Sequence, residues 1–187
     1  MNKSTILATA LMTCFTIFQL SAGDNMSNYT GKGVNHGTQT YGKETVDEIQ
    51  ANGFVKLNGT KVTEHLQVNG RLKAEDAQIE EMQVNGQVTL DNCTVRQKSI
   101  VCGALVAISS KFADELSISS ERVVFNSCAL SSLRILRVGG YQGVQVVELR
   151  GKTKINGPIT FESGNGEIIA DPDSEIMDTV IGGKIRK

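Results

Sequence analysis

The sequence predicts an all-β protein, a single-stranded parallel β-helix of about six to seven short coils with about 17 residues in each. Three observations support this prediction. The tripeptide Val-Asn-Gly occurs at residues 68–70 and recurs at residues 84–86. Apolar residues recur at equivalent positions along the middle of the chain. Within each repeat they stand two apart, as on one face of a β-strand.

The residue before each Asn-Gly pair, or before its equivalent, is apolar in every repeat. These residues are separated by 17, 16, 17, 17 and 17 positions: Ala51, Val68, Val84, Val101, Ile118 and Ile135. Because neighbouring strands lie about 4.8 Å apart, equivalent residues of successive coils are expected to stack in columns. One coil cannot bury its own apolar face, so each coil must be stabilised by its neighbours, as in other solenoids.

The Asn-Gly pairs are expected to mark a corner that the chain passes once in each coil. Asn and Gly tolerate the positive φ angles that a tight corner requires. We therefore expect Asn52, Asn69 and Asn85 to stack as a ladder of amides, with Cys102 and Ser119 in place of the amides in later coils. The six-residue motif typical of left-handed β-helices is absent, and this favours the right-handed form.

Residues 1–23 contain the three parts of a secretory signal peptide, namely the basic Lys3, an apolar stretch and small residues at the end. Three threonines interrupt the apolar stretch, which is short for a bilayer about 30 Å thick, so a signal peptide is favoured over a membrane span. We expect cleavage near Ala22 or Gly23. The expected destination is the periplasm, the outer surface or the extracellular space.

The rest of the chain divides into a leader at residues 24–48 and a β-helix domain at 49–187. The leader is rich in Gly, Asn and Thr and is expected to be flexible, because it cannot bury enough apolar surface to offset its ordering entropy. Its end, at 44–50, is expected to form a helical turn or a strand over the first coil. After Ile135 the repeat loosens, with about four extra residues expected as a loop near 150–153.

The charge balance argues against a nucleic-acid partner. The full chain has 19 basic and 20 acidic residues, and removal of residues 1–23 takes away Lys3 alone, which leaves 18 basic residues and a net charge of −2. Binding to phosphates or to an anionic membrane requires clustered Lys and Arg. No nucleic acid, and no transmembrane span after removal of the signal, is therefore expected.

The run "VNGRLKAEDAQIEEMQVNGQVTLDNCTVRQKSIVCGALVA", residues 68–107, resembles the bactofilins, which are polymer-forming bacterial cytoskeletal proteins. Their cores repeat an apolar-x-Gly-x-apolar-x-Ala pattern followed by alternating Val and Ile. The resemblance covers about residues 51–135. It implies a right-handed triangular β-helix that polymerises end to end through its terminal coils without a nucleotide. Bactofilins are typically cytoplasmic or attached to the inner face of the membrane, whereas this chain carries a predicted export signal.

No catalytic residue, cofactor site or metal site is predicted. His65 follows Glu64, but a solvated histidine at a corner is far more common than a catalytic one. The adjacent carboxylates at 75–76 and 80–81 would point apart on a strand, so they do not form the paired site of a glycosidase. The stretch 171–175, "DPDSE", is expected to be a turn rather than a Ca²⁺ site.

Cysteine spacing makes a further prediction about the core. Cys93 and Cys128 fall in one column two coils apart, about 10 Å by the spacing of strands, which exceeds the reach of a disulfide. They are expected to be buried free thiols.

The leading functional hypothesis is an exported, non-catalytic bacterial β-helix protein with a structural, scaffold or adhesive role. It is expected to bind itself end to end, or to bind a component of the cell envelope. The candidate association surface comprises Val106 and Val124, which face outward on consecutive coils, and Val180, Ile181 and Ile185, which cover or extend the second end. The alternative is a polysaccharide-binding or polysaccharide-degrading protein that uses the irregular region 139–166.

Overall fold

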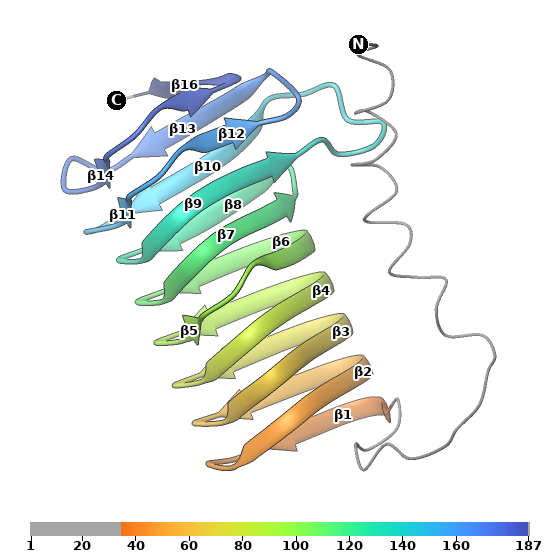
Figure 1. Ribbon diagram of the computed structural model, residues 1–187. Helices are drawn as coiled ribbons and strands as arrows, with labels where there is room; N and C mark the ends of the chain where they lie inside the picture. The colour runs from red at the N-terminus through yellow and green to blue at the C-terminus, as the bar shows by residue number, and fades with distance from the viewer. Residues whose placement is uncertain (1–34, 187) are drawn as a thin grey trace, which may run out of the picture.

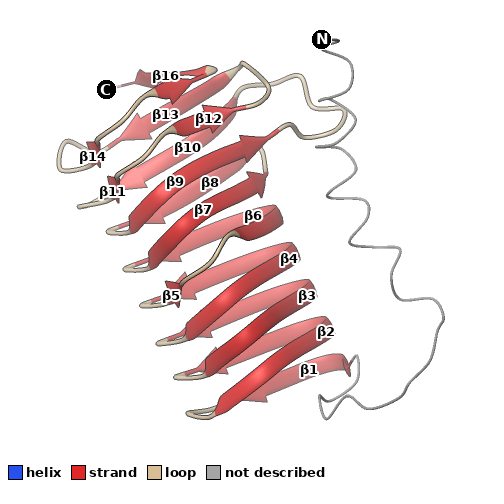
Figure 2. Ribbon diagram, in the orientation of Figure 1, coloured by secondary structure: helices blue, strands red, loops and turns tan. Residues whose placement is uncertain are grey.

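The computed structural model describes residues 35–186, and in this range the chain forms a parallel β-solenoid of about nine coils. Figure 1 shows the coils stacked along one axis from β1 to β16, and Figure 2 shows strands joined by short loops with no helix. All strand pairs are parallel, as the sequence predicts. The fold class is confirmed. The predicted signal peptide and the first part of the leader lie outside the described residues.

In the first half of the solenoid, β2, β3 and β4 run through most of a coil. The strands of this half are β1 (Asn35–Tyr41), β2 (Thr45–Asn58), β3 (Lys61–Glu75), β4 (Gln78–Asp91), β5 (Thr94–Val95), β6 (Ser99–Ile108) and β7 (Lys111–Ser119). The second half contains shorter strands. These are β8 (Arg122–Asn126), β9 (Ala129–Leu136), β10 (Gln145–Arg150), β11 (Lys154–Ile155), β12 (Ile159–Phe161), β13 (Gly166–Ala170), β14 (Glu175–Ile176), β15 (Val180–Ile181) and β16 (Gly183–Arg186).

Each coil passes through a front layer and returns through a rear layer (Figure 1). We call the rear layer the rear sheet. It consists of β1, of the parts of β2, β3, β4 and β6 that follow a glycine, and of β8, β10, β13 and β16. One inward-facing column of this sheet runs through nine levels: Gln39, Val55, Leu72, Val88, Leu105, Val123, Val147, Ile168 and Ile185.

The apolar columns form one continuous core between the two layers. Val68 lies directly below Val84, as the repeat predicts, and both are buried. The largest fully buried side chain is Phe125 on the rear sheet, whose ring makes an edge-to-face contact with Phe112 of the front layer at a centroid distance of 6.1 Å. Full burial of one such side chain contributes about 1.5–3 kcal/mol, so stability is distributed over the whole rod.

The Asn-Gly pairs lie at a bend inside continuous strands rather than at a tight turn. Gly53, Gly70 and Gly86 have φ angles of 147°, 141° and 139°, and strand pairing continues through all three. The glycines are stacked so closely that no side chain fits. A Cβ added to Gly70 would lie 2.1 Å from the carbonyl oxygen of Gly53. Close backbone approach therefore explains the recurring glycine.

The tight turns occur at another position, where the chain leaves the rear sheet. Asp76, Asn92, Ser109 and Ser127 adopt φ angles between 48° and 55° there, in the left-handed region. A small residue follows each of them and points inward. Together with equivalents in the outer coils, these small residues form one column: Thr60, Ala77, Cys93, Ser110, Cys128, Thr153 and Ser174.

Hydroxyl groups of the small column satisfy backbone groups at the turns. Ser110 Oγ donates to the carbonyl of Ile108 at 2.8 Å and accepts from the backbone N–H of Cys93 at 3.1 Å. Thr153 Oγ1 likewise donates to the carbonyl of Arg150 at 2.7 Å. Buried polar backbone groups need such partners. The hydroxyl-bearing residues of this column therefore fit both because they are small and because they hydrogen-bond to the turns.

Three expectations about the organisation of the chain are wrong. About nine coils are present rather than six to seven, because the repeat continues through polar and interrupted segments at both ends. The strand β1 lies in the segment 24–48 that was expected to be a flexible leader, whereas the start of β2 is a strand, one of the two forms expected at 44–50. The segment pairs residue by residue with the next coil, Gln39 with Val55 for example, so backbone pairing orders it despite its polar composition.

The main insertion also lies elsewhere than expected. Residues 136 and 146 pair with residues 119 and 122, so the loop between β9 and β10 contains seven more residues than its equivalent one coil earlier (ten steps against three). Residues 150 and 154 pair with 126 and 129, which leaves one extra residue near 150–153. Gln145 anchors the end of the long loop, because its buried side-chain amide donates to the carbonyls of Ser120 and Leu136 at 2.9 Å and 2.8 Å.

Candidate association surfaces

The rear sheet has an apolar centre on its outer side. All three outward residues of one coil are apolar, namely Ala104, Val106 and Ile108. Val106 is 39% exposed, Ala104 is exposed and Ile108 is half-buried. Val124 lies directly above Val106 in the next coil and is half-buried. The structure therefore places Val106 and Val124 side by side, with more apolar neighbours than the sequence analysis identified.

Charged residues flank this centre on both sides along the rod. On the N-terminal side lie Lys56, Arg71 and Lys73, and Lys73 forms an ion pair of 2.6 Å with Glu75. On the C-terminal side Glu148 is held between two arginines, Arg122 and Arg150. Residues two apart on a strand point to the same side of the sheet. These cations therefore lie on the outer side of the rear sheet, as Val106 does.

Phe54 lies at the N-terminal end of a shallow open depression of about 320 Å³ on the rear sheet. The Lys56 ammonium lies 5.0 Å from the centroid of the Phe54 ring, and the Arg71 guanidinium lies 5.7 Å from it. Both are within the range of cation–π contacts. The depression continues to Ala104 and Val106.

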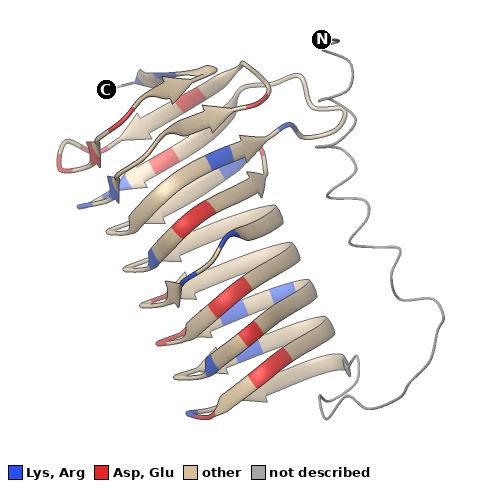
Figure 3. Cartoon of the chain, viewed as in Figure 1, with Lys and Arg blue, Asp and Glu red and all other residues tan. Residues whose placement is uncertain are grey.

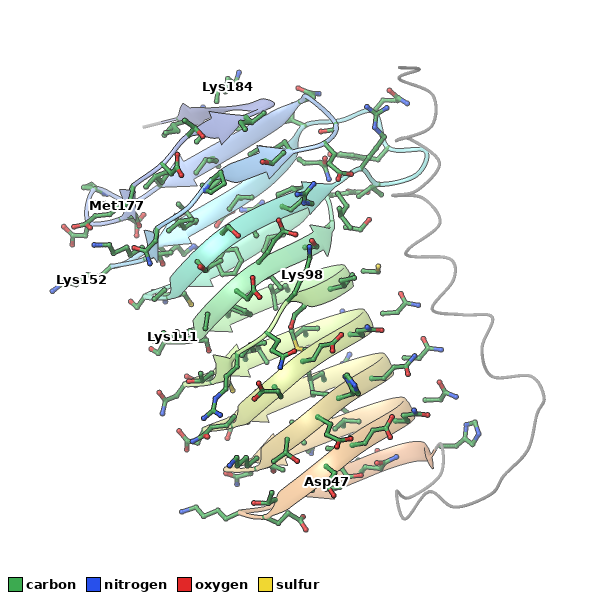
Figure 4. The ribbon with its side chains drawn as sticks, viewed as in Figure 1. Asp47, Lys98, Lys111, Lys152, Met177 and Lys184 are labelled. Atoms are coloured by element: carbon green, nitrogen blue, oxygen red, sulfur yellow. The ribbon has the colours of Figure 1, made fainter. Side chains whose placement is uncertain are left out.

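The C-terminal end of the rod exposes residues that belong to core columns. Ile185 lies above Ile168, yet Ile185 is 46% exposed whereas Ile168 is fully buried. Val180, above the buried Ile159, is half-buried. Ile181 differs from both, because it lies above Thr160 in an outward column and is 54% exposed. Met177 and Lys184 lie on the same last coil (Figure 4).

The N-terminal end has different chemistry. In β1 the inward positions are occupied by Gln39 and Tyr41, and the Tyr41 hydroxyl donates to the Gln39 side-chain carbonyl at 2.7 Å. Tyr41 is 6% exposed, and burial together with Glu44 raises the pKa of its hydroxyl. The described rod therefore begins with polar inward side chains and ends with aliphatic ones.

The amide ladder lies along the glycine bend. Strand pairing places Asn52, Asn69 and Asn85 in one outward column, followed by Cys102. The side-chain amide of Asn85 donates to the side-chain carbonyl of Asn69 at 3.5 Å, in an exposed position. A bond of this length and exposure contributes little to stability.

In the first coils the front layer carries acidic residues on β2, β3 and β4, whereas the rear sheet carries basic residues at this end of the rod (Figure 3). His65 pairs across coils with Glu81 at 2.9 Å rather than with its sequence neighbour Glu64. Further along, Glu115 accepts from Lys98 at 2.8 Å and from Arg134 at 3.2 Å. Burial acts to raise the pKa of Glu115, but these two cations outweigh it and hold that pKa below its usual value.

The remaining chemical candidates from the sequence do not converge. Among residues 35–186 no three His, Cys, Asp or Glu side chains are grouped as metal ligands require. In the irregular region, the Gly-rich loop 139–143 contains Tyr141, whose hydroxyl donates to the carbonyl of Val144. The segment 171–175 forms a turn in which Asp171 accepts from the backbone N–H of Gly151 at 2.8 Å. The described residues contain no helix suited to crossing a membrane.

Cys93 and Cys128 are both buried free thiols, which confirms the prediction from their spacing. Burial raises the pKa of each thiol. The Cys128 Sγ lies 3.3 Å from the carbonyl oxygen of Ala107, to which the thiol donates. Both cysteines thus serve as members of the small column rather than as reactive groups.

No family model, curated protein or solved structure matches this chain. Sequence reasoning found Val106 and Val124 from their outward register, but it missed Ala104, Ile108 and the charges around them. Alternation within "GALVAI" was the available signal, because it places Ala104 and Ile108 on the same side as Val106.

Proposed function

We propose that this chain is an exported, non-catalytic β-solenoid with a structural role, and that its copies associate end to end through the last coil. One observation carries the proposal. Ile185 continues a core column that is fully buried one coil below, but it is 46% exposed because no described coil covers it. An apolar column that ends at a surface is stabilised when a further coil, from another molecule, continues it.

The backbone of the last coil supports the same conclusion. The strands β14, β15 and β16 each pair with one earlier strand, β11, β12 and β13, and have no second partner among the described residues. Their outer N–H and C=O groups therefore form an edge that can pair with another strand. The bactofilin-like residue pattern supports this mode of assembly, because it implies polymers built through terminal coils. The predicted signal peptide supports export, and the expected destination is the cell envelope or beyond.

The last coil offers a matched pair of variants for a test. Ile185→Lys places a charge in the core column at the end, whereas Ile181→Lys places the same charge in an outward column of the same coil. The two isoleucines are similarly exposed, at 46% and 54%. We expect purified protein to form concentration-dependent assemblies in sedimentation velocity and light scattering, Ile185→Lys to abolish them, and Ile181→Lys to retain them.

Two outcomes would contradict the proposal. If the protein stays monomeric at high concentration, its copies do not associate end to end. If both variants lose assembly equally, exposed apolar area rather than the end of the core column determines association. Circular dichroism of both variants verifies that each retains its β-structure.

A further inference from the structure

We propose that two copies of this chain also pair face to face through their rear sheets, with their rods antiparallel and a two-fold axis passing over Val106. This pairing is independent of end-to-end association. It starts from the coil whose three outward residues, Ala104, Val106 and Ile108, are all apolar and which lies near the middle of the rear sheet. An exposed apolar centre with a charged surround is typical of protein interfaces.

The geometry of such a pair follows from the register of the rear sheet. A two-fold axis that lies between the sheets and runs along the central strand keeps the position along each strand but reverses the order of coils. A residue two coils before Val106 therefore meets the residue two coils after it, in the same column of the second copy. Val106 meets Val106, and Thr89 meets Val124 of the second copy.

Charges two coils from the axis are complementary in this arrangement. Glu75 and Arg150 share a column and lie two coils from the axis on opposite sides, so Glu75 meets Arg150 of the second copy. Lys73 meets Glu148 of the second copy in the neighbouring column. Glu75 pairs with Lys73, and Arg150 with Glu148, within each chain, so the dimer joins the two intrachain pairs into one network of alternating charges.

Charges further from the centre agree with this pattern. Three coils from the axis, Phe54 and Lys56 meet Glu167 and Ile169 of the second copy. Lys56 thus lies diagonal to the carboxylate of Glu167, within reach of a long side chain. On the face that meets, no charge within three coils of the axis lies directly opposite a charge of the same sign.

The alternative face-to-face pairing, with the rods parallel, is disfavoured by the same register. Its axis runs along the rod, so each residue of the central column meets itself. Lys56, Lys73 and Glu148 would then each face an identical charge. Like charges directly opposite are destabilising, so the antiparallel arrangement is favoured over the parallel one.

The area of the rear sheet is sufficient for a stable pair. Nine coils at about 4.8 Å and strands of about five residues at about 3.3 Å give roughly 700 Å² on each copy. The total of about 1,400 Å² lies within the range of specific interfaces. Val106 at the centre would be the most completely buried position.

Cysteine cross-linking tests this geometry directly. Facing sheets pack about 10 Å apart, so a short thiol-specific cross-linker rather than a direct disulfide is needed to join opposite residues. We expect Val106→Cys to be cross-linked to its own copy, because it lies on the axis. Thr89→Cys alone should not be, since its copy lies a further distance of about 10 Å away along the rods. A mixture of Thr89→Cys with Val124→Cys should give the mixed product. Protein without an added cysteine is the control for the native thiols, and the Ile185→Lys background separates this pairing from end-to-end growth.

A charge reversal provides an independent test. In sedimentation velocity, Glu75→Arg should weaken the dimer about tenfold or more, because an arginine would then face Arg150 of the second copy twice in each interface. Lys111→Glu, an exposed position on the front layer, is the matched control and should leave the dimer unchanged. Self-cross-linking of Thr89→Cys would show parallel rods and overturn the proposal. A monomer at all concentrations, or equal effects of the two charge reversals, would also overturn it.

Discussion

Gly70 lies directly over Gly53, and a Cβ atom on Gly70 would lie only 2.1 Å from the Gly53 carbonyl oxygen. The same contact recurs with Gly86 over Gly70, at 1.8 Å, and with Gly103 over Gly86, at 2.1 Å. The bend between the layers is therefore a column of backbone packed against backbone. At the spacing that strand pairing imposes between coils, only glycine fits at this bend.

Substitution of a stacked glycine should be strongly destabilising. Gly70→Ala combines a backbone contact at 2.1 Å with a φ angle of 141°, so we expect it to lower the free energy of unfolding by about 3 kcal/mol or more. Gly139→Ala is the control, because a Cβ there meets no atom within 4 Å, and its effect should stay within about 1 kcal/mol. Urea unfolding followed by circular dichroism measures both. Equal stability of the two variants would contradict the packing of the bend.

Removal of a hydroxyl from the small column should leave a buried backbone N–H unpaired. Ser110→Ala deprives the Cys93 N–H of its partner, whereas the Ile108 carbonyl still accepts from the Asn92 N–H, and we expect a loss of about 1–3 kcal/mol. Ser131→Ala, at a half-buried position on the outer side of β9, should change stability by about 0.5 kcal/mol or less. Thermal unfolding of the two variants side by side distinguishes them. A neutral Ser110→Ala would show that water replaces the hydroxyl.

Acid should remove the contribution of Glu115 to stability. The pKa of Glu115 is lowered in the folded state by Lys98 and Arg134, against the effect of burial. Its contribution is therefore fully present above the unfolded value, near 4.5, and is lost as pH falls through the lower folded value. We expect Glu115→Gln to be less stable than the parent at pH 7 and closer to it at low pH. Glu64 is exposed and serves as the control. The difference in urea midpoint between Glu64→Gln and the parent should not become smaller as pH falls.

The buried thiols should be protected from alkylation. Burial both blocks access to Cys93 and Cys128 and raises their pKa, which lowers the thiolate fraction. Mass spectrometry after treatment with iodoacetamide at pH 8 should find both unmodified in native protein and modified in urea. Rapid modification of Cys128 without denaturant would show that the coil around it opens readily.

The repeat in the sequence was sufficient for the fold because stacking forces equivalent residues into equivalent environments. Val68 and Val84 are vertical neighbours because they occupy the same place in consecutive coils. The apolar pattern did not predict β1, because this strand is held by backbone pairing and its inward residue Gln39 is polar. It also missed the tight turns at Asp76 and Asn92, because several residue types tolerate the left-handed region and none repeats there.

The candidate surfaces were predictable only in part for a similar reason. The outward position of Val106 follows from alternation, but its relation to Glu75 and Arg150 does not. These two residues are 75 positions apart, and the long loop between β9 and β10 shifts the count between them. Their equal distance from Val106 appears only when the register of every coil between them is known.

The unequal lengths of the strands also have a mechanical consequence. Between β2 and β3, 13 residue pairs join neighbouring coils, whereas the last two coils are joined by four pairs in β13–β16 and by two each in β11–β14 and β12–β15. At the other end of the rod, β1 is joined to β2 by seven pairs. A tensile load along the axis acts on successive coil junctions in series. Under stretching the rod should therefore fracture first at one of its two end coils, while the long strands β2, β3 and β4 remain a stiff shaft.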